Sequence, residues 1–179
     1  MPNKPEILQR DDPTLREKAK PVAAADIGSA RIQKIIADMQ TSMHSQKDGV
    51  AIAAPQIGAH IQIFVISGPL LKKADKNYTG DDSDLVFINP KITRLSKEKK
   101  YMEEGCLSIR WLYGKVPRST RASITAMNEN GEKISRGASG LLAQIFQHEC
   151  DHLNGILFTD KADEVWEMTE EEIKELQSE

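Results

Sequence analysis

The chain has 179 residues, enough for one domain that buries a core. Apolar residues make up 39% and charged residues 28%, a composition typical of globular proteins. The formal net charge is -3, and residues 160–179 carry nine acidic and two basic side chains, so we expect no nucleic-acid partner. The apolar runs are too short to cross a bilayer and no apolar stretch predicts a secretory signal, so we expect no membrane partner and a cytoplasmic location.

Proline and the spacing of apolar residues predict the elements in chain order. Residues 1–25 should form an extended or irregular arm, because four prolines interrupt it. Periodicity predicts helices over about 27–46, 140–153 and 164–176, strands over 61–66, 85–89, 91–95, 123–128 and 132–135, and a polar loop over 68–84. The order predicts a single α+β domain over 1–179, in which small antiparallel or mixed sheets pack around the helix over 140–153 and an acidic helix lies within 160–179.

The strongest local signal is the run His148-Glu149-Cys150-Asp151-His152. Two histidines four residues apart lie on one helix face and can bind one metal ion. Leu141 and Ile145 continue the same face, so we expect the histidines to point inward. A glutamate beside the first histidine can act on water as a base.

Two histidines leave a metal site incomplete, because a catalytic zinc-type centre has three protein ligands. Cys106, His44, His60 and several carboxylates are candidates for the third. Cys106 lies in a glycine-marked turn after a strand, whereas both histidines are expected at the surface. We expect Cys150 to be a packing residue and do not expect a disulfide between the two cysteines.

Asp151 has two interpretations of equal weight. It is either a carboxylate on the helix surface or a partner that holds a ligand imidazole in one tautomer.

Three motifs occur in the order Gly49-Val-Ala-Ile-Ala-Ala-Pro-Gln56, Glu104-Gly-Cys-Leu-Ser108 and Gln147-His-Glu-Cys-Asp-His152. They resemble the signature motifs of peptide deformylases, and the resemblance covers most of the chain, from about residue 7 to residue 158. It implies a hydrolase that acts on a linear amide and removes the N-formyl group from the initiator methionine of new polypeptides.

The resemblance also implies a metal ligand set of Cys106, His148 and His152. One ion per chain would be bound, physiologically Fe2+, with Zn2+ or Ni2+ as substitutes. Glu149 would serve as the acid and base.

Substrate contacts are implied in the same way. Gln56 and the backbone N–H of Leu107 would donate to the oxygen of the formyl group. Backbone at Val50, Ala51 and Gly105 would bind N-formyl-Met peptides. Ribosome docking through a basic C-terminal helix, a property of some bacterial members, is not expected here because this tail is acidic.

We further hypothesise that Glu104 and Arg118 pair beneath the site and support Gln56. Three positions depart from the family pattern. Ala51 stands where glycine is usual, Arg110 where proline is usual, and Gln144 where the helix usually carries an apolar residue.

Two other functions remain open at this point. A metallopeptidase with the H-E-x-x-H motif would need a histidine or glutamate after His152 as its third ligand, and no histidine follows there, although Glu164 and Glu167 do. A non-enzymatic paralogue that binds formyl-peptides or metal is the third reading, which Ala51 leaves open and which an intact Glu149 and Gln56 argue against.

Overall fold

The computed structural model describes residues 5–76 and 78–178. Its α-helices are α1 Ala30–His44, α2 Gly68–Ala74, α3 Gly140–Leu153 and α4 Glu170–Ser178. Its strands are β1 Ala51–Ala53, β2 Ile63–Ile66, β3 Leu85–Leu95, β4 Lys99–Cys106, β5 Ile109–Ser119, β6 Arg121–Met127, β7 Lys133–Ser139 and β8 Glu164–Glu167. Within the described ranges, none of the helices combines the length and apolar character that a bilayer crossing needs.

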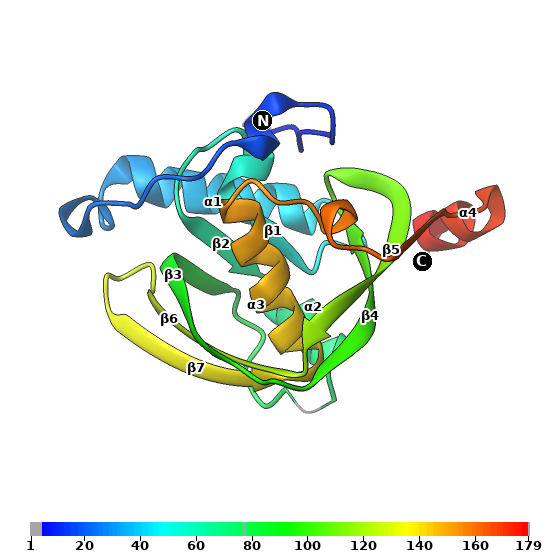
Figure 1. Ribbon diagram of the computed structural model, residues 1–179. Coiled ribbons are helices and arrows are strands. Elements are labelled where there is room, and N and C mark those ends of the chain that lie inside the picture. The colour runs from blue at the N-terminus through cyan, green and yellow to red at the C-terminus, as the bar shows by residue number, and fades with distance from the viewer. Residues whose placement is uncertain (1–4, 77, 179) are drawn as a thin grey trace.

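Two antiparallel sheets and the helices make the expected α+β fold (Figure 1). One sheet has the order β1-β2-β3-β6-β7, and the other has the order β4-β5-β8. The strand pairings in both sheets are antiparallel, so of the two predicted kinds of sheet, antiparallel and mixed, the structure has the antiparallel one. The hairpin predicted around residue 130 is present, with β6 and β7 paired from Arg121↔Ser139 to Met127↔Lys133.

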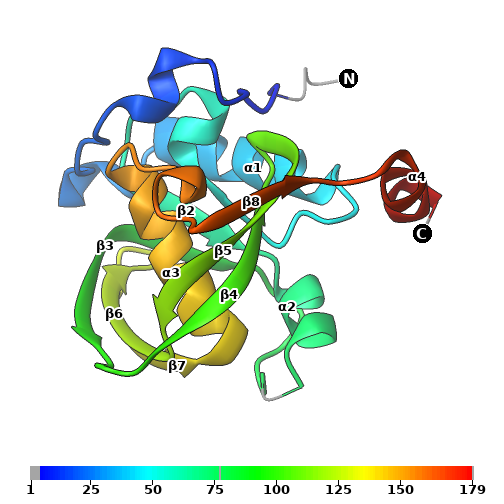
Figure 2. The ribbon, with the colours of Figure 1, turned by 45° about the vertical axis from the view of Figure 1, so that its right-hand side comes forward.

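Helices pack on both faces of the five-stranded sheet around β2, which explains why all four residues of this strand are apolar and buried. On one face, α1 buries Ile32, Met39 and Met43 against the sheet. On the other face, α3 buries Ala143 and Phe146 against it. Figure 2 shows α3 enclosed between the two sheets, so side chains on this helix are held from several sides.

Helix α1 begins and ends close to prediction because its ends have local signals. The Ser29 hydroxyl accepts from the Ile32 N–H and caps its first turn. Gly49 follows its end, where a Cβ atom would lie 2.2 Å from the Met43 carbonyl oxygen. A glycine is therefore required there for packing, just before the segment that enters β1.

Three sequence predictions were wrong in detail. The polar loop over 68–84 begins with α2, whose first turn is capped by the Ser67 hydroxyl. The strands expected over 85–89 and 91–95 are one strand, β3, because Pro90 lies in an irregularity of the pairing beside Asn89, whose φ is +51°. A proline, which lacks an N–H, is tolerated at such a bulge.

The third wrong prediction concerns the C-terminal segment, which was expected to be one helix over about 164–176. Its first part is β8, which pairs with β5 in the register Gly114↔Val165, and α4 begins only at Glu170. The β-branched Val165 and the aromatic Trp166 both favour a strand, and the neighbouring edge of β5 provides the pairing that decides against a helix here. Figure 2 shows α4 standing off the body of the molecule beyond β8.

Candidate active site

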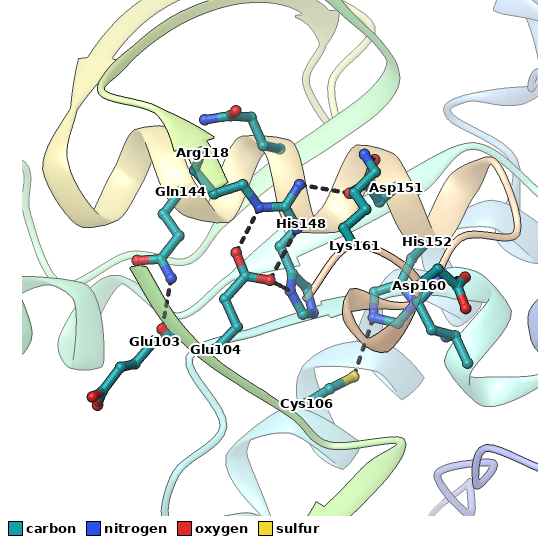
Figure 3. A network of polar contacts seen from close by, with 12 residues as sticks. Glu103, Glu104, Cys106, Arg118, Gln144, His148, Asp151, His152, Asp160 and Lys161 are labelled. Atoms are coloured by element: carbon teal, nitrogen blue, oxygen red, sulfur yellow. Dashed lines mark hydrogen bonds and ion pairs between the residues drawn. The ribbon is translucent and has the colours of Figure 1, made fainter. Parts of the chain in front are cut away.

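Three side chains that could hold a metal ion converge where the two sheets meet α3. Cys106 is the last residue of β4, and His148 and His152 come from successive turns of α3. One ligand atom from each lies within 4.8 Å of the others, and Cys106 Sγ is 3.2 Å from His152 Nε2 (Figure 3). The inward histidine face predicted from Leu141 and Ile145 is confirmed, since Ile145 and His152 are buried.

Of the candidates for a third ligand, the fold brings Cys106 to the histidines. His44 instead pairs with Asp84, at 2.7 Å, on the outside of α1. His60 lies 3.3 Å from Glu17. Cys106 and Cys150 are both free thiols, and Cys150 packs against the apolar core as expected.

The charge state of the cluster favours a thiolate. Burial raises the pKa of the Cys106 thiol, but the charges and hydrogen bonds of His152 and His148 outweigh burial and lower it to about 5. Burial lowers the pKa of His148, whereas its hydrogen bonds with Cys106 and Glu104 raise it well above the usual value. Each imidazole is therefore attracted to the thiolate of Cys106, and the two rings lie close to its Sγ.

A buried ion network lies behind His148 (Figure 3). Arg118, on β5, donates to both carboxylate oxygens of Glu104, at 2.6 and 2.9 Å, and to Asp151 at 2.6 Å. The second oxygen of Glu104 is 2.9 Å from His148 Nδ1. Burial raises the pKa of Glu104, but the hydrogen bonds from Arg118 and His148 lower it to about 2. Glu104 is thus a fixed anion that holds the ring of His148.

The network confirms one hypothesis and corrects two others. Glu104 and Arg118 do pair beneath the site, with their side chains 2% and 3% exposed. They support His148 and not Gln56, because Glu104 lies against the imidazole. Asp151 is neither a free surface carboxylate nor an imidazole partner, since it bridges Arg118 and Lys161.

Gln56 is held in place by neighbours other than Arg118. Its Oε1 accepts from the Ala53 N–H at 2.8 Å, and its Nε2 donates to the Ser108 hydroxyl at 3.0 Å. Nε2 also lies 3.6 Å from Cys106 Sγ, so the amide nitrogen points toward the ligand cluster. Ser108 was quoted in the second motif without a role, and its hydroxyl turns out to orient this amide.

Glu149 follows His148 on α3 and is buried, with an exposed fraction of 3%. Among residues 5–76 and 78–178, neither Glu149 Oε2 nor His152 Nδ1 has a hydrogen-bond partner. Burial raises the pKa of Glu149, although the nearby histidines oppose this. A buried carboxylate without a partner is costly for folding, which is a reason to assign it a role in chemistry.

A cavity of about 330 Å³ opens on this cluster. Its lining includes every residue predicted for the site except His152: Val50, Ala51, Gln56, Gly105, Cys106, Leu107, His148 and Glu149. Gly105 is constrained by packing as well, because a Cβ atom there would lie 2.8 Å from the ring of Tyr113. The fold therefore brings residues from all three sequence motifs to one concave site.

Comparison with known proteins agrees with this site. The family model described as polypeptide deformylase matches residues 4–167. The chain belongs to the polypeptide deformylase family. A peptide deformylase of Psychrobacter cryohalolentis is 44% identical over 154 residues, which is 86% of this chain and 77% of that protein. Peptide deformylase 2 of Clostridium acetobutylicum is 41% identical over 155 residues, covering 87% and 93% of the two chains.

Solved structures of the deformylase family share the fold. One from Acinetobacter baumannii, bound to Met-Ala-Ser, has a TM-score of 0.79 and 30% identity, with 90% of this chain and 99% of that chain covered. One from Synechococcus elongatus, in complex with actinonin, has a TM-score of 0.76 and 34% identity, with 99% and 87% covered. The family are metal-dependent hydrolases that act on the formyl amide of N-terminal formyl-methionine, and this is the activity of the chain.

Proposed function

We propose that this deformylase releases formate with one divalent metal held by Cys106, His148 and His152, and with Glu149 as acid and base. The observation that carries the proposal is the convergence of three ligand atoms within 4.8 Å on a cavity lined by Glu149, whose Oε2 has no hydrogen-bond partner in the described part of the chain. A metallopeptidase is disfavoured, because its third ligand would follow His152, whereas Cys106 precedes both histidines.

The residues fit such a metal by their chemistry. Glu104 accepts at His148 Nδ1, which leaves Nε2 of that ring as the ligand atom. The lowered pKa of Cys106 supplies a thiolate, the form of cysteine that binds metals. One thiolate and two imidazoles suit Fe2+ or Zn2+ and leave a position open for water or substrate. We propose Fe2+, with Zn2+ or Ni2+ as substitutes.

Hydrolysis of the formyl amide needs a nucleophile at neutral pH and a proton for the leaving amine. The chemistry that a bound cation supplies is that of a Lewis acid, which lowers the pKa of water from about 15.7 to about 7. Glu149 takes a proton as the water oxygen bonds to the formyl carbon, and it delivers this proton to the methionine nitrogen as the carbon–nitrogen bond breaks. Formate and a free amino terminus result.

The oxygen of the formyl group becomes negative during the reaction and requires donors already in place. Gln56 meets this need, because Ala53 and Ser108 fix its amide while Nε2 lies close to Cys106. The Leu107 N–H is the second donor that we propose, since Leu107 follows Cys106 directly and lines the cavity.

Two strand edges suit the main chain of the peptide. In both sheets the strand at the cavity, β1 or β4, is an edge strand. The Val50 carbonyl accepts from the Ser67 N–H toward β2, so the main-chain groups of Ala51 face the other way. The Glu103 carbonyl accepts from the Gln144 side chain on α3, so we infer that it faces away from β5, and Gly105, two residues on, then faces the same side. We therefore propose that Ala51 and Gly105 pair with the substrate, and that Val50 contributes cavity lining.

The cellular context is a further part of the proposal. We place the chain in the cytoplasm, where it acts on new polypeptides and has no direct nucleic-acid or membrane partner. Helix α4 carries Glu170, Glu171 and Glu172 in its first turn, a charge that opposes docking on ribosomal RNA.

Formate release tests the function. The chain is purified without oxygen, loaded with Fe2+ or Ni2+, and given formyl-Met-Ala-Ser. We expect formate in the loaded protein and its loss after chelation, with one metal per chain bound by the wild type and none by Cys106→Ser. Internal cleavage of the peptide would instead support a metallopeptidase, and binding without turnover would support a non-enzymatic paralogue.

A further inference from the structure

Besides α3, which contributes His148 and Glu149, two separate segments of the chain form walls of the active-site cavity. One wall is the segment from Asp48 to Gln56, and the other is the hairpin formed by the end of β4 and the beginning of β5. Gln56 and Ser108 tie the walls together beside Cys106. A second tie joins Arg110 on the hairpin to Asp48, with 2.6 Å between Nη1 and Oδ2.

The second tie is held more firmly than an ordinary surface ion pair. The side chains of Arg110 and Asp48 are only 20% and 24% exposed. Arg110 Nη2 also donates to Gln46 Oε1, at 2.7 Å, and the guanidinium lies 5.3 Å from the centre of the Trp111 ring. Partial burial strengthens such charge-assisted bonds, so the guanidinium has one fixed position on the cavity wall.

The backbone next to Arg110 is also constrained. Trp111 has a φ of +69°, in the left-handed region that bulky residues rarely adopt. Its carbonyl accepts from the Met168 N–H at 2.8 Å, just beyond β8. The surrounding structure therefore maintains a strained backbone at Trp111, the residue that follows Arg110.

The size of the cavity indicates what Arg110 meets. A volume of about 330 Å³ is at the lower end of the range for ligand sites, which suits one formylated residue and little more. The rest of a polypeptide substrate has to leave between the two walls. Arg110 and Asp48 both line this space.

The Arg110 guanidinium has N–H groups that no hydrogen bond within the described part of the chain uses, and these can donate to a substrate. Of its five N–H groups, Asp48 and Gln46 each accept from one. Asp48 also neutralises the charge, so a carboxylate gains little there. A neutral acceptor such as a peptide carbonyl is the ligand that this arrangement suits.

We propose that Arg110 is a specificity-determining residue that binds the main-chain carbonyl of the residue after formyl-methionine, and that Asp48 keeps it selective for neutral peptides. The inference rests on the proposed deformylation mechanism and adds a contact to it. It makes peptide length, and not only the first residue, a determinant of KM.

A substrate series of increasing length tests the contact with the metal-loaded full chain. The substrates are formyl-Met methylamide, which lacks the second carbonyl, and the C-terminal amides of formyl-Met-Ala and formyl-Met-Ala-Ser. For Arg110→Ala we expect a roughly tenfold higher KM with the two longer substrates, an unchanged kcat, and no change with the methylamide. An equal rise in KM with all three substrates, or no rise with any, overturns the proposal.

A second variant tests the part assigned to Asp48. Asp48→Asn keeps the shape and a hydrogen-bond acceptor but leaves the charge of Arg110 uncompensated. We expect the KM of formyl-Met-Glu amide to fall severalfold relative to formyl-Met-Ala amide, and high salt to reduce this preference. An unchanged ratio of the two KM values contradicts the assignment.

Controls separate this inference from its premise. Lys72→Ala breaks an exposed ion pair with Asp82 outside the cavity lining and should change none of these values. If the wild type releases no formate from any substrate, the proposed function fails. If it does and the length dependence is absent, only the role of Arg110 fails. Should Arg110→Ala not fold, Arg110→Lys decides, because an ammonium lacks the planar fork and should show the same length-dependent loss.

Discussion

At the scale of single residues, the most informative feature is a carboxylate placed where folding alone would not favour it. Glu149 is buried near Cys106, His148 and His152, and its Oε2 accepts no hydrogen bond from any residue that the structure describes. An apolar residue of similar size would stabilise this position better. A buried base with a raised pKa is closer to the range in which it can both accept and return a proton.

Replacing that carboxylate provides the first prediction. Glu149→Gln should lower kcat for formyl-Met-Ala-Ser by about 10²–10⁴-fold, the usual contribution of a general acid and base. The bound metal should stay at one ion per chain, because Glu149 is not a ligand in the proposed set. Glu171→Gln, on exposed α4, is the matched control. A kcat within tenfold of the wild type would show that another group moves the proton.

At the scale of elements, the site depends on how β4, β5 and α3 are fastened together. Arg118 on β5 contacts Glu104 on β4 and Asp151 on α3, so one guanidinium joins all three elements. Glu104, held by Arg118, in turn fixes the orientation of the His148 ring through its hydrogen bond with Nδ1. Buried ion pairs are poor sources of net stability, and here the geometry that they impose on an imidazole is the better explanation of their presence.

Removing the Arg118 guanidinium should therefore have two effects. Arg118→Gln leaves Glu104 and Asp151 buried without their partner, and we expect a loss of about 3–5 kcal/mol of unfolding free energy. Metal affinity should also fall by about 10–100-fold, as for other residues that orient a ligand. Lys161→Ala removes the half-exposed partner of Asp151 and should cost at most about 1 kcal/mol. Denaturant unfolding and metal titration measure both effects, and equal behaviour of the two variants would refute the role of Arg118.

At the scale of the whole molecule, α3 is both the centre of the core and the carrier of the two histidines. Phe146 on its inner side contacts Phe87, with ring centres 5.3 Å apart, and Phe87 stacks on Phe64 at 4.6 Å. The same helix therefore packs on the five-stranded sheet and presents its other face to Cys106. Stability of the core and precision of the site are linked through this helix.

A core variant measures that link. Phe146→Ala should lower the unfolding free energy by about 3–5 kcal/mol, because it removes a fully buried ring and leaves a cavity. Leu95→Ala, whose side chain is 46% exposed, should change it by no more than about 0.5 kcal/mol. Urea unfolding of both variants provides the comparison, and similar midpoints would mean that the aromatic cluster contributes little.

Metal removal should be visible in the stability of the entire chain. A ligand that binds only the folded state stabilises it, by about 2.7 kcal/mol when its free concentration is 100 times Kd. We therefore expect chelation to lower Tm and Ni2+ to restore it. Glu149→Gln should show the same shift, whereas Cys106→Ser should show none. If neither chelator nor Ni2+ changes the Tm of the wild type, the proposed ligand set is contradicted.

Much of this protein follows from local sequence alone. The i, i+4 spacing of His148 and His152, and the apolar face that they continue, predict a helix with inward histidines because helical periodicity is a property of neighbouring residues. The turn residues near Gly131 predict the β6–β7 hairpin in the same way. Three ordered motifs were sufficient to indicate the family, and with it the expected role of Cys106.

Only the tertiary structure decided the contacts between distant segments. It pairs Glu104 with His148 and not with Gln56, assigns Asp151 to Arg118, and forms β8 where a helix was expected. It also brings Arg110 to Asp48 across the cavity, from positions far apart in the chain. The physical reason is that such partners depend on which strands lie side by side, whereas residue spacing records only the surroundings within one element.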